Sequence, residues 1–241
     1  MRCSRRVAVL ALLVAGCAPR PLLERAIRAR GGPLHSLVRE AEADVKLAFP
    51  GTWPYRTAFL APDAYAWVIY TLAQPDSYLF DGTTTRAFVG TDLVSVDASP
   101  TAALRTHARF TAVASLDALL LPGARVAALA TADLPDGAAT GLAVALADDG
   151  ARYRLGFDAK DRLVVVEGPL ALPPLGAGTV TARYDDFRRA RGFVLPFHTA
   201  YAFAGRPIAD ERASAVCPDD AALTREAFLM PGRVPRCTAP R

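Results

Sequence analysis

The segment from residue 37 to residue 49, LVREAEADVKLAF, alternates between apolar and charged residues with a period of two. Successive side chains of a β-strand point to opposite faces, so the alternation predicts a long strand with one apolar face and one face in water. The apolar positions are Leu37, Ala41, Ala43, Val45, Leu47 and Phe49, and the charged positions between them are Glu40, Glu42, Asp44 and Lys46.

Most of the remaining chain has a similar strand-like pattern of residues, in short runs separated by turn signals such as Asp81-Gly82. Asp-Gly between two β-rich runs is typical of a hairpin. The predicted strands are residues 55–61, 64–72, 77–80, 84–90, 93–97, 124–132, 141–148, 151–158, 162–168, 179–187, 193–205 and 206–216. We expect roughly ten antiparallel strands in a single domain with one large curved sheet, because no linker or internal repeat divides the chain.

Two segments interrupt the strand pattern. Residues 20–30, RPLLERAIRAR, place apolar side chains at helical spacing and precede Gly31-Gly32, which predicts a short helix. Residues 101–121 are rich in Ala and Leu without alternation and precede Pro122-Gly123, which predicts one or two further helices. The expected fold class is therefore mainly β, with a small helical part.

The N-terminus has the anatomy of a secretory signal: three arginines, an apolar run over residues 7–15, and LVAGC ending at Cys17. LVAGC resembles the bacterial lipobox, in which the cysteine is lipidated and becomes the mature N-terminus. We therefore expect a signal peptide over residues 1–16 and one domain over 17–241, anchored to a membrane through Cys17 without spanning it. The alternative is an ordinary signal peptide with an incidental cysteine.

The net charge of the chain limits the kinds of partner that it is expected to bind. The formal charge of +4 falls to about +1 when the three arginines of the signal are removed, leaving 25 basic and 24 acidic residues. No basic patch with interleaved aromatics occurs, so we expect no nucleic-acid partner.

Cys217 and Cys237 are predicted to form a disulfide, as two remaining cysteines in an oxidising compartment most simply do. No metal site is expected, because neither has His or acidic neighbours at suitable spacing.

The usual catalytic motifs are missing: the chain has no G-x-S-x-G, H-E-x-x-H, P-loop or dinucleotide fingerprint. The stretch that most resembles an active site is YDDFRRARGFVLPFHTAYAF, residues 184–203. Alternation there places Phe197 and Tyr201 on the apolar face and His198 on the opposite one, and residues 185–191 are interpreted as a solvated connection. We predict no catalytic residue and no cofactor, with a hydrolase as the less favoured alternative.

The chain has more large apolar residues than two short helical segments can cover. A curved sheet under a small helical lid can leave an apolar cavity, the usual form of a ligand site. The residues predicted to wall such a cavity are Leu47, Phe49, Phe59, Trp67, Ile69, Phe80, Phe88, Phe110, Leu116, Leu120, Phe197 and Tyr201. The alternative for each is plain core packing.

An ordered set of motifs resembles the LolA/LolB-like lipoprotein carrier superfamily, the outer membrane lipoprotein-sorting group. The motifs are LLERAIRARGGPLHSLVREAEADVKL, SYLFDGTTTRAFVG, ALADDGARYRLGFDAKDRLVVVEG, YDDFRRARGFVLPFHTAYAFAGRPIADERASAV and LTREAFLMP, and they cover nearly the whole mature chain. The resemblance implies an unclosed antiparallel β-barrel with a helical lid and an apolar cavity for acyl chains. It implies a binding protein that is not an enzyme and needs no cofactor.

The resemblance also implies a place and a set of partners. The expected partner is an acyl chain, a lipid or a lipidated protein, bound by a monomer in lipoprotein or lipid transport or outer-membrane biogenesis. Ala18 after the cysteine favours the periplasmic face of the outer membrane, by resemblance to enterobacterial sorting. The lipobox is a departure from the soluble carrier and makes the chain more like the anchored acceptor, whose exposed hydrophobic loop has no clear counterpart here. The alternative function is a scaffold or interaction lipoprotein with a filled core.

Overall fold

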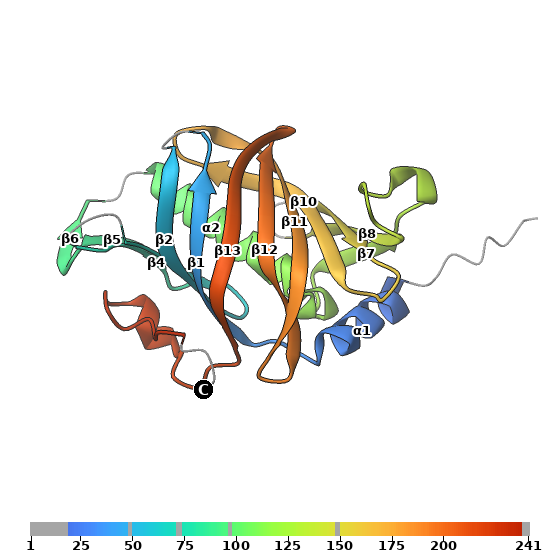
Figure 1. Ribbon diagram of the computed structural model, residues 1–241, viewed down its shortest axis with the longest axis horizontal. Helices are drawn as coiled ribbons and strands as arrows, with labels where there is room; N and C mark the ends of the chain where they lie inside the picture. Colours follow the sequence, from blue (N-terminus) through green and yellow to red (C-terminus); the bar gives the residue numbers. More distant parts are fainter. Residues whose placement is uncertain (1–18, 48–49, 71–73, 96–97, 148–149, 238–241) are drawn as a thin grey trace, which may run out of the picture.

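A computed structural model describes residues 19–47, 50–70, 74–95, 98–147 and 150–237 (Figure 1). Within these residues, thirteen antiparallel strands form one curved sheet. The strands are β1 (Ser36–Val45), β2 (Gly51–Leu60), β3 (Ala64–Ile69), β4 (Asp76–Phe80), β5 (Thr85–Val89), β6 (Asp92–Val94), β7 (Ala124–Ala128), β8 (Thr140–Leu146), β9 (Arg152–Phe157), β10 (Leu163–Leu172), β11 (Gly176–Ala190), β12 (Phe193–Phe203) and β13 (Arg206–Pro218). Each predicted run overlaps one strand, so the count of roughly ten was low.

The sheet is a meander with one non-sequential pairing. Consecutive strands pair with each other except β6 and β7, and β1 also pairs with β13, which joins the two halves of the sequence. The edge strands are β6 and β7, which do not pair with each other, so the barrel is unclosed. Strand β1, whose residues alternate between the two faces, therefore lies at the centre of the sheet and is paired on both sides.

A helical segment covers the concave face of this sheet. Helix α2 (Ala98–Ala114) and the 3-10 turn η1 (Asp117–Leu120) connect the edge strands β6 and β7. In Figure 1, α2 lies behind the central strands, and it packs against β3 and β4 at one side and β10 at the other. The predicted helical insertion thus bridges the opening between the two halves of the sheet.

Helix α1 (Pro19–Arg30) packs at the end of the sheet formed by the second half of the chain (Figure 1). Its apolar stripe of Leu22, Leu23, Ala26 and Ile27 is buried in a cluster with residues of α2 and β8–β11. Gly31 ends the helix at a φ of 119°, and a Cβ there would lie 2.7 Å from the carbonyl oxygen of Gly192. Only glycine meets both conditions without strain.

The C-terminal segment after β13 covers the convex face of β1–β4. Phe228 and Val234 are buried there against Val38, which points away from the concave face. The predicted disulfide between Cys217 and Cys237 ties this segment to β13. The even-numbered face of β1 is therefore in water only along part of its length, contrary to the simple reading of the alternation.

The charged stretch near residue 185 differs from the sequence-based interpretation. Strand β11 continues to Ala190, and the turn consists of Arg191 and Gly192, both at positive φ. Asp185 is in register with His198 of β12, so it is a strand residue and not part of a solvated connection. The turn was placed too early because Asp is common in turns, whereas here Asp185 and Asp186 lie on exposed positions within the strand.

Candidate ligand-binding cavity

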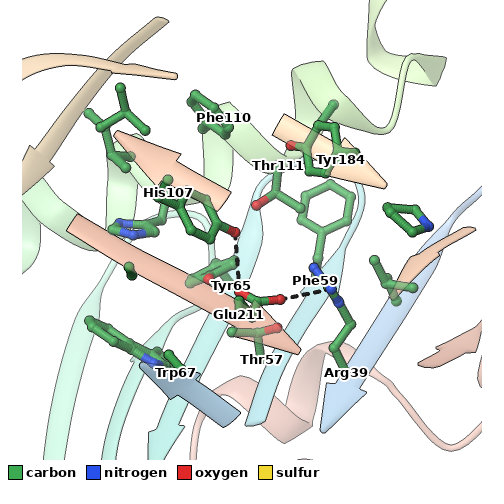
Figure 2. A pocket seen from close by; sticks show the side chains of 18 of the residues that line it. Arg39, Thr57, Phe59, Tyr65, Trp67, His107, Phe110, Thr111, Tyr184 and Glu211 are labelled. Carbon is green, nitrogen blue, oxygen red and sulfur yellow. Dashed lines mark hydrogen bonds and ion pairs between the residues drawn. The ribbon is translucent and has the colours of Figure 1, made fainter. Parts of the chain in front are cut away.

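A cavity of about 540 Å³ lies between the concave face of the sheet and α2. Both halves of the chain contribute to its lining. The first half supplies residues of α1, β1, β2, β3, α2 and the turn before η1, and the second half supplies residues of β10–β13. The volume falls within the range of about 300–1,000 Å³ that is typical of small-molecule sites. Most of the lining is apolar, and its polar side chains include Arg39 and Glu211 from the sheet and Thr111 from α2 (Figure 2).

One wall of the cavity is an aromatic stack contributed by β3 and α2. The ring of His107 lies between Tyr65 and Trp67, with centroid distances of 5.6 and 5.8 Å and interplanar angles below 30° (Figure 2). The Nδ1 of His107 lies 2.9 Å from the carbonyl oxygen of Ala103, one turn earlier in α2. Burial lowers the pKa of His107, so the ring is neutral and serves as part of an apolar wall.

The polar wall is centred on an ion pair between adjacent strands. Arg39 of β1 and Glu211 of β13 approach to 2.7 Å between Nη2 and Oε1, and their side chains are only 12% and 6% exposed (Figure 2). Although burial alone would lower the pKa of Arg39, Glu211 and the surrounding tyrosines raise it above its ordinary value. Arg39 is therefore a permanent cation at this wall.

Tyrosine hydroxyls surround this ion pair. The hydroxyl of Tyr201 donates to Oε2 of Glu211 at 3.2 Å, so both carboxylate oxygens have a partner. Burial, together with the charge of Glu211, raises the pKa of Tyr55, Tyr65 and Tyr201 above the usual tyrosine value. The phenols are thus neutral hydrogen-bond donors at any ordinary pH.

The other cations that line the cavity are paired in the same way. Nη2 of Arg30 lies 2.7 Å from Oδ2 of Asp117, and Nη2 of Arg162 lies 2.6 Å from Oδ2 of Asp158. Each arginine in the described lining therefore has a carboxylate partner, and the lining as a whole carries no unbalanced charge. This balance favours an uncharged or weakly polar occupant over an ion.

Seven of the residues predicted to wall the cavity line it, and whether they contact a ligand stays a prediction. They are Leu47, Phe59, Trp67, Ile69, Phe110, Leu116 and Tyr201. They come from four elements, β2, β3, α2 and β12, and from the loops after β1 and before η1, which the curvature of the sheet and the crossing of α2 bring to one volume.

The other predicted wall residues lie elsewhere. Phe80 is buried against α2, and Phe88 is buried in the cluster beneath the C-terminal segment. Phe197 packs among small residues of β1 and β13, and Leu120 is 42% exposed at the end of η1. None of these four is part of the cavity lining. Phe49 lies outside the described residues, as does Cys17.

Sequence reasoning missed Arg39 and Glu211, although a signal for both is present. Arg39 occupies an odd position of β1, in phase with Leu37 and Ala43, and is the charged exception on the apolar face. Glu211 lies in phase with Ala209 and Ala213 in the same way. When two paired strands each carry one charged residue on an otherwise apolar face, and the two charges have opposite signs, the sequence predicts a buried ion pair between them.

His198 lies on the opposite face from the cavity, as the alternation predicted. Its Nδ1 is 2.7 Å from Asp185 and its Nε2 is 3.0 Å from Asp210. Although burial opposes protonation, these two carboxylates raise the pKa of His198 above its ordinary value. The arrangement is a cross-strand ion cluster; no group of His, Cys, Asp and Glu suited to a metal ion occurs in the described part of the chain.

Comparison with known proteins identifies the fold. No protein-family model matches the sequence, and no curated protein matches it at a significant level. The structure is similar to that of a LolA superfamily protein from Nitrosomonas europaea, with a TM-score of 0.57 at 14% identity over 88% of this chain and 97% of that one. It is similar to a DUF1329 family protein from Desulfovibrio piger, with a TM-score of 0.56 at 9% identity and the same two coverages.

The structure also shows a weaker similarity to that of a putative outer membrane lipoprotein-sorting protein domain from Vibrio parahaemolyticus, with a TM-score of 0.48 at 12% identity over 88% of this chain and 95% of that one. The chain therefore has the LolA-like fold that the sequence resemblance implied: an unclosed antiparallel sheet with a helical lid. At these identities the similarity establishes the fold alone. No helix among the described residues is long and apolar enough to cross a membrane.

Proposed function

We propose that this protein holds an acyl chain of a lipid or lipidated protein in the cavity beneath α2, as part of lipoprotein or lipid transport or outer-membrane biogenesis. The observation that carries the proposal is the 540 Å³ cavity with a predominantly apolar lining. An acyl chain loses about 0.8 kcal/mol of favourable burial for every methylene exposed to water, so its passage requires a shelter of this kind. The LolA-like fold supports the same function.

We further propose that the protein acts as a monomer on the periplasmic face of the outer membrane, attached through a lipid on Cys17. The support is the signal anatomy of residues 1–16 and the lipobox-like LVAGC. The expected single mature domain is residues 17–241, and the described sheet uses strands from both ends of that range.

The cavity distinguishes binding from the two alternative functions. A scaffold lipoprotein with a filled core would have side chains in the space that is open here. A hydrolase would need an activated nucleophile, whereas the Nδ1 of His107 contacts a backbone carbonyl, Arg39 is ion-paired with Glu211, and Glu211 accepts a hydrogen bond from Tyr201. We therefore propose a binding protein rather than an enzyme.

The test uses the domain made without Cys17, so that its own anchor does not enter the cavity. A ligand at 100 times its dissociation constant adds about 2.7 kcal/mol of stability, and each kcal/mol raises Tm by about 2–4 °C for a chain of this length. We expect such a rise with glyceryl monododecanoate. The Ala114→Phe variant, which fills the cavity from α2, should lose it, whereas Ala177→Phe at an exposed position of β11 should keep it. No rise in the wild-type domain and no lipid detected by mass spectrometry would overturn the proposal.

A further inference from the structure

A second cavity of about 430 Å³ lies on the convex face of the sheet, against the C-terminal segment that follows β13. Arg56 of β2, Val68 of β3 and Ser77 of β4, which are in register across three strands, form one side of it. The segment between Pro231 and Arg236 forms another side. Because side chains alternate along a strand, the residues of β2 and β3 that line the cavity beneath α2 point to the other face. The sheet therefore separates the two cavities.

The C-terminal wall of this second cavity is held in place by covalent and hydrogen bonds. The disulfide between Cys217 and Cys237 ties the wall to β13, and the backbone N–H of Cys237 donates to Oε1 of Glu40 at 3.1 Å. Nη1 of Arg56 donates to the carbonyl oxygen of Val234 at 3.0 Å, and Arg56 is only 6% exposed. The site is therefore formed before any ligand arrives, as small-molecule sites usually are.

One cation of this lining is available to a ligand. The charge of Arg56 is balanced by Glu40, whose Oε1 lies 2.6 Å from Nε of the arginine. Arg236, in contrast, is exposed and has no ion-pair partner among the residues that the structure describes. The described part of the lining contains no acidic residue, so Arg236 gives the site one uncompensated positive charge. The cavity beneath α2 has no such charge, because the arginines of its described lining are paired.

Much of the remaining lining consists of rings. It includes the side chains of Tyr70, Pro75, Pro231 and Pro235. The guanidinium of Arg56 lies over the ring of Tyr70, 5.6 Å from its centroid. Burial raises the pKa of Tyr70, although the charge of Arg56 opposes the rise, so the phenol is neutral and able to donate a hydrogen bond. The site thus offers rings to an apolar body and a cation to a charged end.

We infer that the second cavity binds a carboxylate attached to an apolar body, with the carboxylate paired to Arg236. A guanidinium binds a carboxylate through two parallel hydrogen bonds, and one uncompensated cation matches its single negative charge. A phosphate monoester would carry about −1.5 to −2 and leave part of its charge unpaired. The inference goes beyond the acyl-chain binding proposed above and does not depend on it, because the two sites lie on opposite faces of the sheet. The carboxyl end of a peptide and a free carboxylic acid both have this chemistry.

The test uses N-acetyl-prolyl-phenylalanine, its uncharged carboxamide and the free acid 3-phenylpropanoate. Each is titrated at about pH 7 and low salt into the isotopically labelled domain without Cys17. Binding is followed by NMR at the backbone amides of Gly90, Thr91 and Gly232, which belong to the lining. We expect saturable shifts at these amides, with the peptide acid bound at least about tenfold more tightly than its carboxamide. Equal affinity of acid and carboxamide, shifts confined to other parts of the domain, or binding of none of the three compounds would overturn the inference.

The Arg236→Gln variant tests the assigned cation and should abolish the preference for the acid over the carboxamide. The matched control is Arg233→Gln, which removes an arginine of the same segment that lies outside the lining, 3.8 Å from Glu226, and should retain the wild-type preference. Both arginines are exposed, so neither change should impair folding. A preference that survives in Arg236→Gln would contradict the assignment.

The same titrations distinguish the two sources of the carboxylate. Tighter binding of the peptide acid than of 3-phenylpropanoate would support the site and assign it to the carboxyl end of a partner protein. Equal or tighter binding of 3-phenylpropanoate would support the site and assign it to a small carboxylic acid. A repeat with saturating glyceryl monododecanoate separates this inference from the proposed function: the affinity for the acid should not change, whereas competition would place the acid beneath α2 and overturn the inference.

Discussion

Removing Arg39 alone should destabilise the protein far more than removing the whole ion pair. The side chains of Arg39 and Glu211 are 12% and 6% exposed and their charged atoms are 2.7 Å apart, so solvent screens them little. Breaking such a pair typically costs about 3–5 kcal/mol because one buried charge is left unpaired, whereas apolar replacement of both partners is often neutral or stabilising. We expect Arg39→Met to lower the free energy of unfolding by about 3–5 kcal/mol.

The double variant Arg39→Met/Glu211→Leu should recover most of this loss. It leaves the hydroxyl of Tyr201 without its acceptor, which costs about 1–3 kcal/mol if the hydroxyl stays buried, so full recovery is not expected. The assay is urea unfolding followed by circular dichroism, with unchanged m-values required for each comparison. Arg20→Met removes an exposed i,i+4 pair and should change stability by about 0.3–0.5 kcal/mol. A double variant no more stable than Arg39→Met would refute the reasoning.

Three further predictions concern other parts of the molecule. Cys237→Ser should lower the free energy of unfolding by about 3 kcal/mol in the chain-entropy model, because the disulfide closes a loop of 20 residues; urea unfolding that shows no loss would contradict it. His198→Gln should be more destabilising at about pH 5 than at about pH 9: the raised pKa of His198 means that its stabilisation is complete below the unfolded value and is lost as pH rises through the folded one. An equal effect at both pH values would show that Asp185 and Asp210 do not act on the imidazolium. Phe59→Ala should cost about 3–5 kcal/mol, measured by urea unfolding, since Phe59 is 2% exposed; a loss below about 1 kcal/mol would mean that the wall of the cavity is loosely packed.

The strands were predictable because each depends on local alternation. The period of two over residues 37–49 correctly predicted which residues of β1 share a face. Leu37 and Val45, at odd-numbered positions, both line the cavity. The helix over 20–30 followed from its spacing and from the two glycines after it, and the structure has α1 at Pro19–Arg30. Local signals of this kind do not depend on how the sheet curves.

The cavity was only partly predictable because it depends on contacts between distant strands. Periodicity assigns a side chain to one face of its own strand, but it does not say what covers that face. Phe88 was misplaced for this reason: it lies in the cluster that the C-terminal segment covers, more than a hundred residues later in the chain. The pairing of β1 with β13, which brings Arg39 to Glu211, is likewise invisible to local analysis.

The most direct test of acyl-chain binding uses the two tryptophans of the chain. Trp53 and Trp67 are its only tryptophans, and both line the cavity. An acyl chain that carries bromine atoms quenches tryptophan fluorescence on close contact, so a brominated glyceryl monoester titrated into the domain without Cys17 reports on occupation of this cavity. We predict saturable quenching that the unbrominated ester reverses by competition and that is lost in Ala114→Phe. Unquenched fluorescence at concentrations where the ester raises Tm would show that the lipid binds elsewhere, and would contradict the account.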